Sequence, residues 1–154
     1  MSICWYQDKE LEINFDDLPK LSIRYVKPDD LQNIVNEINN KPFVNLSNLN
    51  VILVDKIKEK VYEFLIKENY IWDGATIPRV FWRLIGSKTD NKFLIPSLIH
   101  DFMCENHKCI DCDRYFSTIV FERLLYVSGV SPINRWMMKH SVDNFQKIFG
   151  NWRG

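Results

Sequence analysis

The sequence predicts an α+β fold, with β-hairpins and one helix in the N-terminal part and a bundle of about three to four helices in the C-terminal part. Two observations support this prediction. Apolar residues alternate with polar ones in the first half, whereas they recur every three or four residues in the second half. Strands that precede helices in this way are typical of an α+β protein. The length of 154 residues, 46% of them hydrophobic, predicts a single domain over residues 1–154.

Four short stretches in the first half are predicted to be β-strands, because their residues alternate or are β-branched. They are residues 11–15, 21–26, 51–54 and 61–71. A turn at residues 16–19 would join the first two strands into a hairpin, and the last two would pair as a second hairpin. Between the hairpins, Pro28 begins a helix whose apolar stripe runs from Leu31 to Ile38.

Four stretches with helical periodicity follow, and glycine or proline residues separate them. They are residues 80–85, 93–105, 110–127 and 133–149. No internal repeat or low-complexity segment divides the chain. The C-terminal half is therefore expected to form a helical layer on the hairpins.

Charge and hydropathy exclude several classes of protein. Twenty basic residues balance twenty acidic ones, so the chain has no overall field to hold a nucleic acid. No apolar run is long enough for a transmembrane segment, and no basic segment followed by an apolar one is found near Met1, so we expect neither a membrane span nor a secretion signal. Four cysteines are then expected to be reduced thiols of a protein made in a cytoplasm. Contact with a membrane surface through Trp136, Met137, Met138 and Lys139 stays open, although such residues at helical spacing usually belong to a core.

The segment from Asp73 onwards is the first that places polar groups where a core does not need them. Asp73 and Gly74 follow a predicted strand, and a tight turn there could hold an anion on backbone amides or a cation on carbonyls. Thr76, Arg79 and Trp82 would support this turn or a substrate. The alternative is that Asp73 only bonds its own backbone in an Asx-type turn.

His100, Asp101 and Asp113 are the other candidates for chemistry. Adjacent helical residues point about 100° apart, so His100 and Asp101 are expected to serve two neighbouring tasks, general base and cation or substrate ligand. Asp113 lies one turn before Phe116 on the next helix, and a carboxylate near a core needs a partner. We therefore expect His100 to hydrogen-bond Asp113. The alternative is that His100 caps a loop and Asp101 pairs with a surface arginine.

A metal-free network is favoured at this cluster, so no cofactor is expected. Asp73 and Asp101 could alternatively hold calcium or magnesium, because hard cations prefer oxygen ligands. A zinc site is the third alternative, and its ligands would be Cys104, His107, Cys109 and Cys112. These four fall within nine residues, whereas structural zinc sites usually draw two pairs from separate turns.

Taken together, five segments resemble a family of phages and prophages, the domain of unknown function 1353. They are residues 73–79, 81–82, 100–101, 113–116 and 149–150. The resemblance covers residues 61–150 in order and spacing, and residues 1–50 lie outside it. Thr76 stands where a serine is usual, and Cys104 where a tyrosine is usual. The resemblance implies a phage or prophage origin, with genes often near tail or lysis functions.

A second, local resemblance concerns His100, Asp101 and Asp113. A histidine oriented by an aspartate from a second helix, with another aspartate beside it, is similar to the two-helix site of secreted phospholipases A2. The glycine-rich calcium loop of that family is absent from this sequence, and Cys104 again replaces a tyrosine.

These features lead to two hypotheses. The first is a phage or prophage-encoded structural or accessory protein of the virion, tail or assembly, made in the host cytoplasm and binding other phage proteins. Its Asp and His cluster would be a buried network. The second is a small hydrolase, phospholipase-like or directed at the cell envelope, with His100 as general base, Asp113 orienting it, and Asp73 and Asp101 placing a cation or substrate. A pocket open to solvent would favour the hydrolase.

Overall fold

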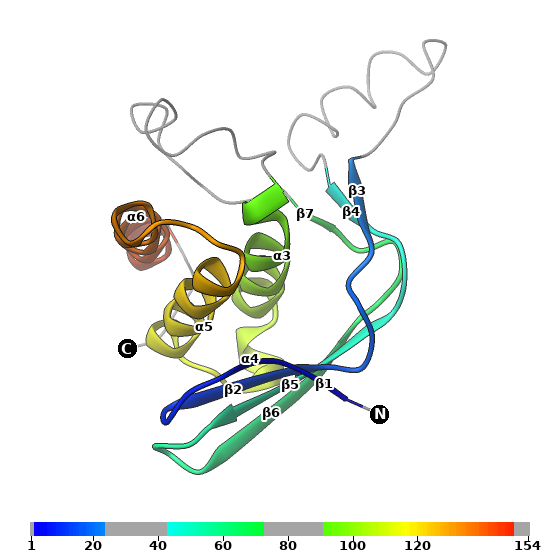
Figure 1. The fold of residues 1–154 in the computed structure, drawn as a ribbon, viewed down its shortest axis with the longest axis horizontal. Coiled ribbons are helices and arrows are strands. Elements are labelled where there is room, and N and C mark those ends of the chain that lie inside the picture. The colour runs from blue at the N-terminus through cyan, green and yellow to red at the C-terminus, as the bar shows by residue number, and fades with distance from the viewer. Residues whose placement is uncertain (1, 24–42, 73–90, 150–154) are drawn as a thin grey trace.

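The structure is a computed structural model that describes residues 2–23, 43–72 and 91–149 (Figure 1). The strands in these ranges are β1 (Ile3–Gln7), β2 (Leu11–Phe15), β3 (Leu21–Ile23), β4 (Phe43–Asn45), β5 (Leu49–Asp55), β6 (Lys60–Ile66) and β7 (Ile71–Trp72). The helices are α3 (Asn91–Glu105), α4 (His107–Ile110), α5 (Arg114–Val127) and α6 (Pro132–Phe149). Antiparallel strands come first and helices follow, so the predicted α+β fold is confirmed.

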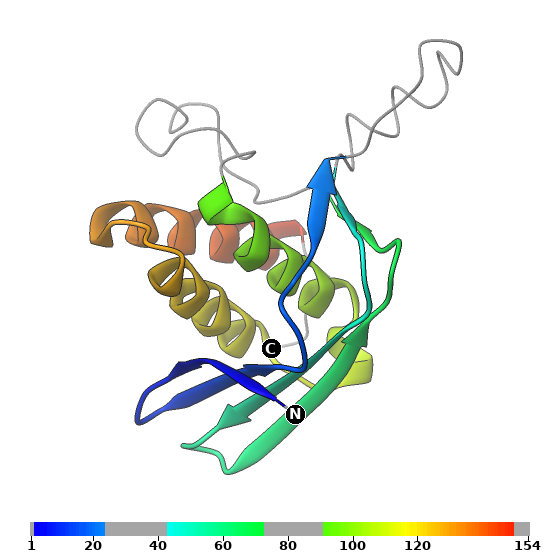
Figure 2. The ribbon, with the colours of Figure 1, turned by 45° about the vertical axis from the view of Figure 1, so that its right-hand side comes forward.

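The strands form two antiparallel sheets. The larger has the order β1-β2-β5-β6 and the smaller has the order β3-β4-β7. Short connections lead from β4 to β5 and from β6 to β7, so the smaller sheet continues from one end of the larger (Figure 2). In β5, every second residue from Leu49 to Asp55 is buried, as expected for a strand with one face on a core.

The predicted hairpin between residues 11–15 and 21–26 is wrong. β2 instead pairs with β1 and β5, while β3 pairs with β4 in the other sheet. The pairing of the second hairpin is confirmed, because β5 pairs with β6. The predicted strand 61–71 is two strands, since the chain turns between them through Asn69 at a positive φ of 72°. The helices expected at residues 31–38 and 80–85 lie outside the described residues.

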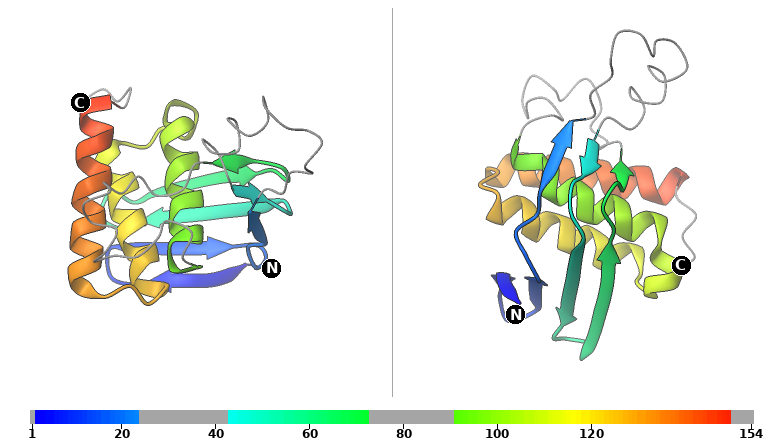
Figure 3. Two further views of the ribbon diagram at one scale, coloured as in Figure 1. Left: turned by 90° about the horizontal axis from the view of Figure 1, so that it is seen from above. Right: turned by 90° about the vertical axis from the view of Figure 1, so that its right-hand side faces the viewer.

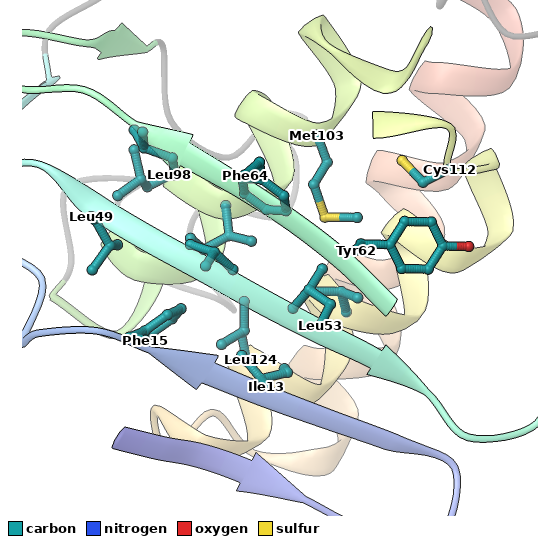
Figure 4. Close-up of a cluster of buried hydrophobic side chains, with 14 of the residues drawn as sticks. Ile13, Phe15, Leu49, Leu53, Tyr62, Phe64, Leu98, Met103, Cys112 and Leu124 are labelled. Atoms are coloured by element: carbon teal, nitrogen blue, oxygen red, sulfur yellow. The ribbon is translucent and has the colours of Figure 1, made fainter. Parts of the chain in front are cut away.

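The main core lies between the larger sheet and the helices α3 and α5 (Figure 4). The sheet contributes the inward side chains of β2, β5 and β6, and the helices contribute the side chains that face them. Its members include Ile13, Phe15, Leu53, Phe64, Leu98, Met103, Val120 and Leu124. Tyr62 stacks on Phe116 with ring centroids 4.6 Å apart, which ties β6 to the first turn of α5.

A second, smaller core attaches α6 to the other helices. Phe93 of α3, Phe121 and Leu125 of α5, and Met138 and Val142 of α6 are all buried in it. The helix α6 packs on the side of α3 and α5 that faces away from the sheet (Figure 3). The order of layers is therefore sheet, then α3 with α5, then α6.

A cluster of charged side chains fastens the first hairpin to α5. Asp8 accepts hydrogen bonds from Tyr6 Oη at 2.5 Å and from Arg123 Nε at 3.0 Å, as well as from the backbone N–H groups of Glu10 and Leu11. Burial alone would raise the pKa of Asp8, but these hydrogen bonds hold it well below its usual value. Burial and the carboxylate of Asp8 raise the pKa of Tyr6 to about 12. The cluster fixes the position of α5 along the sheet.

Candidate functional site

The candidate residues at the strand end lie outside the described part of the chain. They are Asp73, Gly74, Thr76, Arg79 and Trp82. The structure therefore places His100, Asp101, Asp113 and the four residues considered for zinc.

His100 lies in the middle of α3 and is buried. Its ring centroid is 4.9 Å from that of Phe121 on α5, and its Nε2 is 3.6 Å from Cys104 Sγ one turn further along α3. The neighbouring Asp101 keeps an oxygen 4.0 Å from His100 Nδ1, which is longer than a hydrogen bond. The ring is therefore held by an aromatic side chain and a thiol.

The thiol beside His100 is electrically neutral. Burial, followed by the negative charge of Asp101, raises the pKa of Cys104 far above that of a free thiol. A protonated thiol can donate a weak hydrogen bond to a ring nitrogen of His100. Cys104 therefore contacts the ring of His100 as a neutral side chain.

The space next to His100 and Asp101 is small. The described residues around it are these two and Val142, Phe145 and Gln146 of α6, and its volume is about 10 Å³. A volume of about this size holds a single water molecule. The described side chains therefore pack closely around His100.

Asp113 caps the N-terminus of α5. Its backbone is extended, and its Oδ1 accepts a hydrogen bond from the N–H of Phe116 at 2.6 Å. Its Oδ2 accepts from Lys58 Nζ at 3.0 Å, in an ion pair that is about half exposed. Burial works to raise the pKa of Asp113, but the N–H of Phe116 and the charge of Lys58 outweigh it and lower the pKa. Both carboxylate oxygens are therefore engaged at the end of the helix.

The predicted hydrogen bond between His100 and Asp113 is wrong. His100 contacts α5 at Phe121, and Asp113 lies eight residues earlier in the chain. At a rise of 1.5 Å per residue, that separation is about 12 Å along the helix axis. The cause is the capping bond, because a side chain that caps a helix end points along the axis and not at the neighbouring helix.

A cleft that the sequence did not indicate lies beside Asp113. Lys58, Lys60 and Tyr62 of the β5–β6 hairpin form one wall of a volume of about 370 Å³. The other wall consists of His107, Lys108, Asp111, Cys112 and Asp113. Lys60 Nζ crosses the cleft to donate to the carbonyl oxygen and to Oδ2 of Asp111, at 2.7 and 2.9 Å. Alternating lysines at a hairpin turn look like an ordinary solvated turn, and the contact with Asp111 spans 51 residues, so no local pattern marked this cleft.

The four residues considered for zinc have separate environments. Cys112 is buried in the main core, where burial raises its pKa to about 11, while Cys109 is exposed. His107 Nδ1 donates to the carbonyl oxygen of Cys104 at 2.8 Å. In the described ranges, no three His, Cys, Asp or Glu side chains gather in the way that metal ligands do.

Comparison with known proteins gives one family. A family model described as "protein of unknown function (DUF1353)" matches residues 50–142, a range that runs from β5 to α6 and contains His100 and Asp113. A protein of Sinorhizobium fredii described as uncharacterized protein y4jT is 48% identical over 33 residues, which are 21% of this chain and 10% of that protein. The match thus spans about a tenth of the relative's length. No solved structure matches. None of the helices described for this chain is long and apolar enough to cross a membrane.

Proposed function

This chain belongs to the DUF1353 family, and we propose that it is a phage or prophage-encoded structural or accessory protein of the virion, the tail or their assembly. It would be made in the cytoplasm of the bacterial host and would bind other phage proteins. In this proposal, His100 and Asp113 stabilise the helical layer and take no part in turnover. The phage origin rests on the motif resemblance from residue 73 to residue 150.

The packing of His100 is the observation that carries the proposal. A general base must reach a proton of its substrate directly or through one water molecule. The ring of His100 instead lies against Phe121 and Cys104, and the space beside it has a volume of about 10 Å³. Such surroundings suit a side chain that fills a core.

The hydrogen bonds of Asp113 support the same proposal. In a hydrolase, this carboxylate would orient the imidazole ring of His100. Here its two oxygens accept from the N–H of Phe116 and from Lys58, so they stabilise the start of α5 and its contact with the β5–β6 hairpin. Two residues proposed for one catalytic task thus perform two separate structural tasks.

Particle fractionation tests the proposal. A tagged copy of the chain would be expressed in the bacterium that carries the gene, the phage or prophage would be induced, and particles would be separated on a density gradient. We expect the chain to sediment with particles or with assembly intermediates, in a fixed ratio to the capsid protein. The tagged chain in a strain cured of the phage is the control and should stay at the top of the gradient.

A second measurement distinguishes the hydrolase. The purified chain would be assayed on phospholipid vesicles and on isolated cell walls, beside the variant His100→Gln. Hydrolysis that is lost in this variant while its thermal melting is unchanged, by a chain that never sediments with particles, would overturn the proposal.

A further inference from the structure

Two neighbouring hollows meet at the ion pair between Lys58 and Asp113. The lysine hollow is the cleft of about 370 Å³ that lies between the β5–β6 hairpin and α4. The apolar hollow has a volume of about 210 Å³ and lies between the turn of the same hairpin and the first two turns of α5. Lys58 and Asp113 are part of the walls of both. An elongated ligand can therefore extend from one hollow into the other.

Positive charge is in excess in the lysine hollow. Its charged side chains are three lysines and two aspartates, which leaves one positive charge over: Lys58, Lys60, Lys108, Asp111 and Asp113. The two aspartates pair with Lys58 and Lys60. In the ranges that the structure describes, no carboxylate pairs with Lys108. An ammonium group has three N–H donors, so Lys108 can bind an anion without losing a partner.

A buried tyrosine adds a hydroxyl group to the lysine hollow. Tyr62 is 4% exposed, and in Figure 4 its hydroxyl points away from the other core side chains. Lys60 Nζ lies 4.8 Å from the centre of its ring. Burial raises the pKa of Tyr62, so at neutral pH the hydroxyl keeps its proton and can donate it in a hydrogen bond. Neutral and charged donors that converge in this way suit a phosphate or carboxylate group.

The ion pairs in the lysine hollow do not block such a group. The side chains of Lys58 and Asp113 are 59% and 48% exposed, and Asp111 is 88% exposed. Exposed ion pairs contribute little to stability, because water screens both charges. An anion that enters the hollow can therefore share the lysines with the aspartates at small cost.

The second hollow offers mainly apolar side chains to a ligand. They come from β2, from the hairpin turn and from one side of α5: Leu11, Ile57, Tyr115, Phe116 and Ile119. Glu10 and Asp55 also line this hollow, and their negative charges would repel an anion. The charged end of a ligand therefore belongs among the lysines, and its apolar end belongs beside α5.

We propose that the two hollows form one binding site for an anionic amphiphile, whose phosphate or carboxylate head lies among the lysines and whose apolar chain lies in the apolar hollow. The ligand would be free in solution, because a lipid in a membrane keeps its chains in the bilayer and has none to place beside α5. The site goes beyond the proposed function. It involves no turnover and does not depend on a phage origin.

Isothermal titration calorimetry of the full chain tests the two-part site. The ligands would be octyl phosphate and butyl phosphate below their micelle concentrations, with inorganic phosphate and octanol as partial ligands. We expect one octyl phosphate per chain, and a weaker affinity for each partial ligand. Each CH₂ group that enters the apolar hollow should raise the affinity by up to about fourfold, so octyl phosphate should bind more tightly than butyl phosphate.

A lysine pair of variants tests the head group. Lys108→Gln should weaken octyl phosphate about three- to tenfold, because it removes a charged donor. Lys20→Gln is the matched control, since Lys20 is also exposed but lines neither hollow. It should leave the affinity unchanged.

An isoleucine pair of variants tests the apolar chain. Ile57→Ser should reduce the ratio of the octyl phosphate affinity to the butyl phosphate affinity, because Ile57 lines the apolar hollow. Ile133→Ser is the matched control: Ile57 is 71% exposed and Ile133 is 68% exposed, but Ile133 lies on α6. Far-ultraviolet circular dichroism checks that each of the four variants folds.

Four outcomes would overturn the proposal. The first is a chain that binds no octyl phosphate, and the second is one that binds octanol or inorganic phosphate as tightly. The third is an equal loss for Lys108→Gln and Lys20→Gln, or a loss for Ile133→Ser and not for Ile57→Ser, which would place the ligand elsewhere on the surface. The fourth is a chain that ignores octyl phosphate but sediments with vesicles of phosphatidylcholine and phosphatidic acid, which would make a membrane the source of the anion.

Discussion

His100 and Asp113 both contact helix α5, but in opposite surroundings. His100 packs against Phe121 within the helix, whereas Asp113 caps the N-terminus of the helix. The side chain of His100 is 4% exposed and touches an aromatic ring and a neutral thiol. The side chain of Asp113 is 48% exposed and touches a backbone N–H and a lysine. A buried side chain contributes mainly through packing, whereas water screens the charge of an exposed one and leaves its hydrogen bond to the backbone. One ionisable residue thus packs against α5 in the core, and the other caps the N-terminus of α5.

The largest effect is expected at the buried end of this comparison. His100→Ala should lower the free energy of unfolding by about 2 to 4 kcal/mol, because it leaves a cavity against Phe121. Urea denaturation followed by circular dichroism measures the change. His140→Ala is the matched control: His140 is exposed, so its loss should change the free energy of unfolding by less than about 0.5 kcal/mol. A similar cost for both histidines would mean that His100 is not part of the core.

A smaller effect is expected at the exposed end. Asp113→Ala should cost about 1 kcal/mol, because it removes the acceptor for the N–H of Phe116. Asp113→Asn separates the cap from the charge, since asparagine caps as well as aspartate but does not pair with Lys58. We expect Asp113→Asn to stay near the wild type in the same urea measurement. A loss as large as that of Asp113→Ala would show that the ion pair, and not the cap, matters.

The sequence predicted the elements of the fold better than their pairing. Periodicity located α3, α5, α6 and the β5–β6 pair, because side chains on one buried face leave a regular trace in the chain. It missed β1, where a bulge between Cys4 and Tyr6 interrupts the alternation. Without β1, the turn at residues 16–19 was taken for a hairpin, although the chain passes there from one sheet to the other.

The candidate site could be predicted only in part. His100 was placed correctly on a helix beside α5, but Asp113 was assigned to its inner face. An aspartate directly before a helical stretch is a common N-cap, so the sequence already held the signal for its role. The contact of Asp113 with Lys58 joins residues 55 positions apart, and such a pairing depends on the packing of the hairpin against α5.

The smallest effect is the coupling between the two residues, and it tests their separation most directly. If His100 and Asp113 belong to different sites about 12 Å apart along α5, the double variant His100→Ala with Asp113→Ala should lose the sum of the two single losses. We expect additivity within about 0.5 kcal/mol in urea denaturation. A cycle on Asp8 and Arg123, which hydrogen-bond at 3.0 Å, is the positive control and should give a measurable coupling. A coupling between His100 and Asp113 as large as that of the control would show that they belong to one site. Residues that share no contacts have no direct way to alter each other's contribution to the free energy of unfolding.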